Sequence, residues 1–155
     1  MPKPLSGACS CGEVTYRLTA RPMFVHCCHC LACQKQTGSA FAINAIIEAS
    51  HVELTRGKPK ATQMPTESGR PHEIFRCSTC KVALWSDYGR RRVLLFVRVS
   101  TLDRPHAIKP DVHIFTRSKV PWVGLPKEAK AFKAFYDMDK LWPAKSIARR
   151  NALFG

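Results

Sequence analysis

The sequence reads GACSCG over residues 7–12 and CSTC over residues 77–80, and these two stretches decide the fold. Each contains a tight pair of cysteines, and four thiolates form the ligand set of a closed tetrahedral zinc site. A metal bound by both pairs would link the N-terminal loop to a distant turn, so we predict a structural zinc. The alternatives are free buried cysteines or another metal. The four predicted ligands are Cys9, Cys11, Cys77 and Cys80.

A second cluster lies between these pairs, where residues 28–33 read CHCLAC. Its cysteines, Cys28, Cys30 and Cys33, can place three sulfurs on one ion, and the sequence offers no obvious fourth ligand. Three protein ligands and one open position are what a catalytic zinc needs, because a substrate must enter the coordination shell. The spacing therefore favours a reactive metal centre in this cluster.

A closed structural site is the alternative for this cluster, completed by Cys27, His26 or His29. Cys27 is poorly placed for this role, since adjacent side chains point apart in an extended chain, and we expect it to be a small buried hydrophobic residue. His29 lies inside the cluster, where its ring could hydrogen-bond a metal-bound thiolate or carry a proton. The other histidines are expected to be structural or on the surface.

The composition is that of a single globular domain: the chain has 155 residues, of which 45% are hydrophobic and 23% charged. The longest apolar run, residues 93–97, is far shorter than the ~20 residues that a membrane span needs. The residues before Cys9 show no secretory signal, so we expect a cytoplasmic protein without a transmembrane helix. Thiols stay reduced in the cytoplasm, and the eight cysteines therefore favour metal binding or catalysis over disulfides.

The hydrophobic pattern predicts a mainly β chain up to about residue 120, with a short helical turn over residues 31–37 that ends at Gly38. After Pro126, helix-forming residues predict one amphipathic helix over residues 127–136, followed by a loosely attached tail to Gly155. The predicted strands cover residues 13–18, two segments within residues 39–54, and residues 73–76, 82–85 and 93–99.

These motifs resemble those of the glutathione-dependent formaldehyde-activating enzyme family, which also includes centromere protein V. The family pattern is Gly-x-Cys-x-Cys-Gly, then Cys-His-Cys-x-x-Cys followed by Thr-Gly-Ser, then Cys-x-x-Cys. The chain matches it in order at residues 7–12, 28–33, 37–39 and 77–80, and TLD at 101–103, HIF at 113–115 and Trp122 also look like the family's C-terminal signature. The resemblance covers about residues 5–125. Lys81 departs from it, because family members usually carry glycine there.

The resemblance implies a zinc-containing β-tent fold of small coiled antiparallel sheets, with residues 5–125 as the zinc domain. From their composition, we predict that residues 126–155 are a C-terminal helical extension of the same domain. It implies two zinc ions per chain, a structural ion on Cys9, Cys11, Cys77 and Cys80 and a catalytic ion on Cys28, Cys30 and Cys33. The implied activity is that of a carbon–sulfur lyase of the S-(hydroxymethyl)glutathione synthase type, which interconverts this adduct with glutathione and formaldehyde. The candidate catalytic residues are then Cys30 and His29.

The balance of charge is strongly basic, with 25 Lys and Arg against 11 Asp and Glu and a net charge of +14. Glutathione carries two carboxylates and one ammonium, so a basic rim suits it, and Lys35 and Arg76 near the cysteine clusters are candidates for binding it. The alternative function is a noncatalytic zinc-stabilised module that binds nucleic acid or protein. The sequence shows no recognition helix beside the last cysteine pair, so nucleic-acid binding should be weak and nonspecific.

Overall fold

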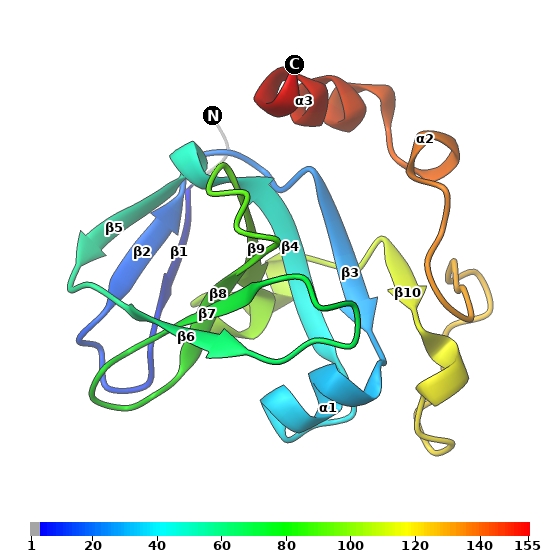
Figure 1. Ribbon diagram of the computed structural model, residues 1–155, viewed down its shortest axis with the longest axis horizontal. Helices are drawn as coiled ribbons and strands as arrows, with labels where there is room; N and C mark the ends of the chain where they lie inside the picture. Colours follow the sequence, from blue (N-terminus) through cyan, green and yellow to red (C-terminus); the bar gives the residue numbers. More distant parts are fainter. Residues whose placement is uncertain (1–3) are drawn as a thin grey trace.

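The computed structural model describes residues 4–155, which form two β-sheets and a helical C-terminal segment (Figure 1). The smaller sheet has three antiparallel strands in the order β1-β2-β5. These strands are β1 (Leu5–Ala8), β2 (Thr15–Leu18) and β5 (Val52–Arg56). The prediction of a mainly β fold with a C-terminal helix is confirmed.

The larger sheet has seven strands in the order β10-β3-β4-β9-β8-β7-β6. Neighbouring strands pair antiparallel, except that β10 and β3 run parallel. The strands are β3 (Phe24–Cys28), β4 (Ala42–Glu48), β6 (Lys60–Met64), β7 (His72–Arg76), β8 (Ala83–Tyr88), β9 (Leu94–Arg98) and β10 (Val112–Ile114). This order places β10, which is distant in the sequence, next to the strand that leads into the second cysteine cluster.

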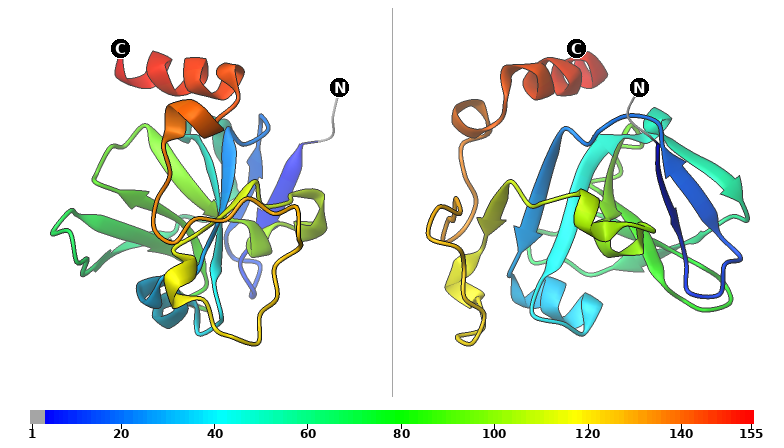
Figure 2. Two further views of the ribbon diagram at one scale, coloured as in Figure 1. Left: turned by 90° about the vertical axis from the view of Figure 1, so that its right-hand side faces the viewer. Right: turned by 180° about the vertical axis from the view of Figure 1, so that it is seen from behind.

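The described residues also form three α-helices and four short 3-10 turns. The helices are α1 (Leu31–Thr37), α2 (Met138–Leu141) and α3 (Ala144–Phe154), and the turns are Ala49–His51, Val99–Thr101, Pro105–Ala107 and Thr116–Ser118. As predicted, α1 ends at Gly38, whose φ of 64° stops the helix. Figures 1 and 2 place α1 and α3 at opposite ends of the larger sheet. Among residues 4–155, no helix combines the length and apolar character that crossing a membrane requires.

The main core lies between the two sheets, because alternate side chains of their strands face the interior. In β2, Tyr16 and Leu18 are each 1% exposed. The Tyr16 ring packs edge-on against Trp85 of β8, with 5.4 Å between the ring centroids, and so joins the two sheets. Full burial of an apolar side chain contributes roughly 1.5–3 kcal/mol. Cys9 and Cys77 belong to the same buried cluster, so this core also positions the first cysteine site.

Most predicted strands are confirmed, because β2, β4, β5, β7, β8 and β9 overlap the predicted ranges. Four strands were not predicted: β1, β3, β6 and β10. Strand β3 is buried along its whole length and reads FVHCC, so it lacks the alternation of polar and apolar residues that marks a half-buried strand. Strand β6 lies at the sheet edge and is almost wholly exposed, so its sequence KATQM has no apolar face.

The predicted helix over residues 127–136 is wrong, because this segment lies alongside β10 without forming a helix. The backbone N–H of His113 donates to the carbonyl of Lys130 over 2.8 Å, and that of Phe132 donates to the carbonyl of His113 over 3.0 Å. Phe132 and Tyr136 pack in a second buried cluster around Phe24 of β3. Tertiary packing and pairing with β10 therefore override the helix propensity of this segment.

The prediction of a loosely attached C-terminal tail is also wrong, since α3 lies across the end of the larger sheet (Figure 2). The Ser146 hydroxyl donates to the carbonyl of Met23 over 2.6 Å. The Arg149 guanidinium donates two hydrogen bonds, of 2.7 and 2.6 Å, to the carboxylate of Glu48. These contacts are polar, and a hydrophobic pattern carries no signal for them.

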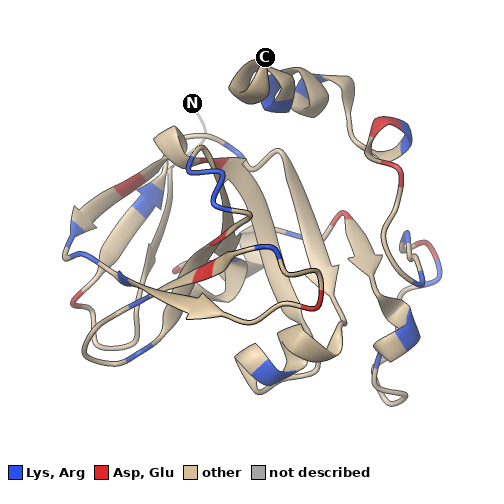
Figure 3. Cartoon of the chain, viewed as in Figure 1, with Lys and Arg blue, Asp and Glu red and all other residues tan. Residues whose placement is uncertain are grey.

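Lysine and arginine are spread over strands, helices and loops rather than gathered on one element (Figure 3). The run Arg90-Arg91-Arg92 is bound by acids. Arg90 and Arg92 lie 3.3 and 3.0 Å from the Glu73 carboxylate, and Arg92 also lies 4.0 Å from that of Asp87. Part of the basic charge in the turn between β8 and β9 is therefore compensated by carboxylates of β7 and β8.

Candidate metal centres

The first cysteine site lies where two turns meet beside the main core. Cys9 directly follows β1, and Cys77 directly follows β7. The Sγ atom of Cys11 lies 3.6 Å from that of Cys9 and 3.7 Å from that of Cys77. With Cys80 included, the four sulfurs all lie within 4.8 Å of one another and could hold a metal ion. The structure thus brings together all four ligands that the sequence predicts for this site.

Backbone N–H groups point at the sulfurs in both turns. The N–H of Val14 donates to Sγ of Cys9 over 3.3 Å. The N–H groups of Val82 and Cys11 lower the pKa of Cys80 to about 6. Such hydrogen bonds stabilise the thiolate, which is the form of cysteine that binds a metal. The chemistry of this four-sulfur donor set therefore fits zinc.

Lys81, where the sequence departs from the family pattern, adopts a left-handed backbone conformation with φ of 67°. Its N–H donates to the carbonyl of Cys77 over 3.0 Å, and its Nζ donates to the carbonyl of Ser78 over 2.5 Å. In the other turn, Gly12 has a similar φ of 76°. Glycine reaches this region without the steric penalty of a Cβ atom. The turn therefore forms despite the lysine, at a cost in backbone strain.

Replacing Lys81 by glycine is expected to raise the free energy of unfolding by about 0.5–1 kcal/mol. The free energy gained by relieving the backbone strain exceeds the entropic cost of folding a more flexible chain. Chemical unfolding of the metal-loaded protein measures the change. Lys81→Ala is the matched control, since it removes the hydrogen bond to Ser78 but keeps the Cβ atom. An equal gain in stability in both variants would contradict the explanation by strain.

The second cysteine site lies where β3 ends and α1 begins. Cys28 is the last residue of β3, Cys30 caps the N-terminus of α1, and Cys33 lies in the first turn of that helix. Their sulfurs lie within 4.8 Å of one another, so they could hold a metal ion. Cys28 is buried, whereas Cys30 and Cys33 are partly exposed. The cluster is therefore accessible from one side, as a site with an open position requires.

The three thiols of this site titrate together. Hydrogen bonds from the Cys28 and Cys33 thiols, aided by the Cys33 N–H at 3.2 Å, lower the pKa of Cys30 to about 2. The hydrogen bond to Cys30 in turn raises the pKa of Cys28. One thiolate therefore forms readily while a neighbour keeps its proton. A divalent ion that favours sulfur, such as zinc, is what would bring all three to the thiolate form.

A third group of donors surrounds the His29 ring. The parallel pairing of β10 with β3 places His113 beside Cys27. The Nε2 atom of His29 lies 3.0 Å from Nδ1 of His113 and 3.6 Å from Sγ of Cys27. These three atoms lie within 4.8 Å of one another and could also hold a metal ion. Cys27 is 1% exposed, so its predicted burial is confirmed.

The contact between His29 and His113 could not be read from the sequence, which placed His113 among the structural or surface histidines. It depends on the register between two strands that were not themselves predicted, β3 and β10. Burial lowers the pKa of His29 to about 4, so its ring is neutral at physiological pH. The hydrogen bonds of this ring run to Cys27 and His113.

A hollow of about 430 Å³ lies between the end of α1, strand β4 and the turn that leads into β8. The predicted ligand-binding residue Arg76 lines it, together with Lys81 and Arg98. Lys35 is exposed on α1 and does not line the hollow. Arg98 carries no signal in the sequence, because it ends an apolar strand and only its burial, with 7% exposed, distinguishes it from other arginines.

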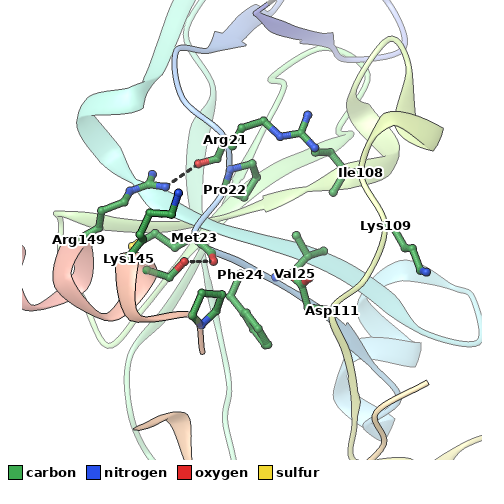
Figure 4. A pocket seen from close by; sticks show the side chains of 12 residues that line it. Arg21, Pro22, Met23, Phe24, Val25, Ile108, Lys109, Asp111, Lys145 and Arg149 are labelled. Carbon is green, nitrogen blue, oxygen red and sulfur yellow. Dashed lines mark hydrogen bonds between the residues drawn. The ribbon is translucent and has the colours of Figure 1, made fainter. Parts of the chain in front are cut away.

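A second hollow, of about 400 Å³, lies between β3 and α3 (Figure 4). Ser146 bonds to Met23 here, and Arg149 donates to the carbonyl of Arg21 over 2.9 Å. The residues that line this hollow include no cysteine or histidine. It is therefore the joint at which α3 docks rather than a part of the cysteine sites.

The family model described as glutathione-dependent formaldehyde-activating enzyme matches residues 4–118. All eight cysteines lie within that range. Among solved structures, the crystal structure of a Rhodobacter sphaeroides protein is similar, with 21% sequence identity and a TM-score of 0.49. That match covers 68% of this chain and 92% of the other. No curated protein matches the chain.

Proposed function

Because the chain belongs to the glutathione-dependent formaldehyde-activating enzyme family, we propose that it is a zinc-dependent carbon–sulfur lyase. Its substrates are adducts of glutathione, or of a related small thiol, with formaldehyde. The observation that carries this proposal is the group of three sulfurs of Cys28, Cys30 and Cys33, all within 4.8 Å of one another and accessible from one side.

The two cysteine sites have different roles in this proposal. The four-sulfur set around Cys9 and Cys77 is the structural zinc site, and the three-sulfur set around Cys30 is the catalytic one, which gives two ions per chain. Zinc on the three-sulfur set would supply a Lewis acid that keeps the thiol of the ligand deprotonated at neutral pH. Cys30 has the lowest pKa of its set, and its side chain, like that of Cys33, is partly exposed, so these two sulfurs lie on the side from which the ligand would enter.

The reaction is balanced without an oxidant or a further reactant. In the direction of adduct formation, the sulfur of the thiol bonds to the carbonyl carbon of formaldehyde. The carbonyl oxygen gains one proton and the thiol loses one, so the number of protons is unchanged. In the reverse direction the carbon–sulfur bond breaks and both reactants return. The protein must therefore bind the thiol, orient it and move one proton.

In this proposal His29 and His113 move that proton. His29 lies between Cys28 and Cys30 in the sequence, and its Nε2 atom lies 3.0 Å from Nδ1 of His113. His29 is fully buried, while His113 is partly exposed, so the pair could carry a proton between the buried His29 ring, which also contacts Cys27, and solvent. A neutral imidazole can both accept and donate a proton, which such a path requires.

In this proposal Arg76 contributes to binding of the thiol ligand, because it lines the hollow at the end of α1. Lys35 is exposed on the same helix, and we assign it at most a long-range contribution to the attraction of an anionic ligand. We further propose that residues 5–125 form the catalytic zinc domain, that residues 126–155 extend it, and that the protein acts in the cytoplasm.

The net charge of +14 supports a second candidate function, a noncatalytic module that binds nucleic acid. The spread of basic residues over many elements favours only weak, nonspecific and salt-sensitive binding (Figure 3). A sequence-selective complex that survives high salt would favour this candidate over the enzyme.

Exchange spectroscopy by NMR tests the proposed enzyme directly. Zinc-loaded protein added to glutathione and ¹³C-formaldehyde is expected to accelerate exchange between free formaldehyde and S-hydroxymethylglutathione. We expect about two zinc ions per chain, one of which mild chelation removes without unfolding. Chelator-treated protein at the same concentration is the control. The proposal fails if the loaded protein exchanges these species no faster than glutathione does alone.

A further inference from the structure

Arg98 at the end of β9 is a buried cation without an acidic partner among the described residues. It is 7% exposed. Its Nη1 donates to Oδ1 of Asn44 over 2.6 Å, and its Nη2 donates to Oε1 of Gln36 over 3.3 Å. Its Nε is buried and has no hydrogen-bond partner in residues 4–155. Both partners of this guanidinium are therefore neutral, and several of its N–H groups remain free.

A buried charge of this kind requires an anion nearby. Removing a guanidinium from water is costly unless an opposite charge compensates for it, and buried arginines are normally paired. The other buried ionic groups in the described part of the chain follow this rule, as Glu48 and Glu73 are both bound by arginines. Arg98 is the exception, because no carboxylate of the described residues compensates its charge.

The negative charges that act on Arg98 come from cysteine sulfurs. The pKa of Arg98 is lowered by burial, and the charges of Cys33, Cys28 and Cys30 act against that effect. In the proposed enzyme these three sulfurs are ligands of a divalent ion, which leaves the set with one net negative charge. Arg98 and Arg76 together carry two positive charges and line the same hollow. An anion in the hollow would therefore complete their compensation.

The hollow beside Arg98 has the charge that such an anion requires. Its lining includes the three cationic residues Arg76, Lys81 and Arg98, and no aspartate or glutamate. The polar residues Thr37, Ser39, Ser100 and Thr101 also line it. Its volume of about 430 Å³ lies within the roughly 300–1,000 Å³ of small-molecule pockets.

We infer that Arg98, together with Arg76, binds a carboxylate of the thiol substrate in this hollow, and that this contact selects acidic thiols over neutral ones. The inference rests on the proposed function, because the cysteine set beside Arg98 is what would bind the sulfur of the same ligand. Gln36 links the two parts: it lies on α1, the helix that Cys30 caps, and it accepts a hydrogen bond from Arg98. Asn44 and Gln36 hold the guanidinium in place for an incoming carboxylate.

Two thiols with the same peptide skeleton but different carboxylate charges test the inference. Calorimetric titration of the zinc-loaded wild-type protein compares glutathione with its diethyl ester, which keeps the thiol but lacks both carboxylate charges. We expect glutathione to bind at least about tenfold more tightly than the ester. Equal affinities would overturn the carboxylate site and leave the proposed lyase standing. Binding of neither thiol would overturn both proposals.

Variants then locate the site. Arg98→Gln and Arg76→Gln are each expected to weaken glutathione binding by roughly ten- to hundredfold. The affinity for the diethyl ester should not change, because the ester has no carboxylate for either arginine to bind. Arg98→Lys, which keeps the charge but loses the planar fork, should weaken glutathione binding less than Arg98→Gln. Arg70→Gln is the matched control for the loss of one positive charge, because Arg70 is exposed and outside the hollow.

An equal loss for both thiols in Arg98→Gln, accompanied by a loss of zinc, would overturn the inference, since Arg98 would then serve only the cysteine set. If Arg98→Gln does not fold, the preference of the wild-type protein and the Arg76→Gln variant decide the question, because Arg76 is only partly buried at the end of β7.

Discussion

Replacing Cys77 by serine is expected to leave the protein largely unfolded and poorly soluble. Cys77 is 0% exposed and belongs to the same buried cluster as Cys9, so the metal site and the main core form together. Structural zinc binding contributes on the order of 10 kcal/mol to folding, whereas a domain is stable by only about 5–15 kcal/mol in total. Loss of one of the four ligands weakens zinc binding, whose free energy is as large as the whole free energy of unfolding.

Thermal melting and zinc content of Cys77→Ser measure this effect. Cys27→Ser is the matched control, because it makes the same chemical change at a buried cysteine outside both proposed zinc sites. It should lower the free energy of unfolding by only about 1–2 kcal/mol, the usual cost of a changed buried polar group. A Cys77→Ser protein that melts like Cys27→Ser would show that the four-sulfur site does not support the fold.

The first cysteine site could be predicted from the sequence because its information is local. Each pair is compact, and the backbone N–H groups that favour thiolate come from residues next to the pair, such as Val82 beside Cys80. The strands around the site were also predictable where one face is buried, as in β2 with Tyr16 and Leu18. In both cases one short segment carries the whole pattern.

The errors and omissions arise where long-range contacts decide the outcome. Residues 127–136 have helix-forming composition, yet their backbone groups bond to β10 and the Tyr136 ring is buried against Phe24. His113 gains its contact with His29 only through the pairing of β10 with β3. Arg98 is one arginine among many in the sequence, and its burial beside neutral partners appears only in the folded chain.

Replacing Cys30 by serine is expected to abolish activity while the fold persists. Cys30 caps α1, and its Sγ accepts the N–H of Cys33 over 3.2 Å. Serine is a preferred N-cap residue, so the variant should keep the helix start while it loses one sulfur ligand of the three-sulfur set. The main core and the four-sulfur site contain no atom of Cys30, and their stability should be unchanged.

Three measurements on Cys30→Ser separate the two sites: melting temperature, zinc per chain and exchange of formaldehyde with S-hydroxymethylglutathione. We expect a wild-type melting curve and one zinc ion fewer per chain. Loss of a hydrogen-bond partner of a metal ligand lowers activity by roughly ten- to hundredfold, and loss of the ligand itself should lower the exchange rate by at least as much. Cys30→Ala is the companion variant. It should lose the same activity and about 1 kcal/mol of additional stability, because alanine cannot cap α1. If Cys30→Ser melts as badly as Cys77→Ser, the three-sulfur set is a second structural site. If the variant keeps full exchange activity, Cys30 is dispensable for the reaction. Either result removes the mechanistic basis of the proposed lyase.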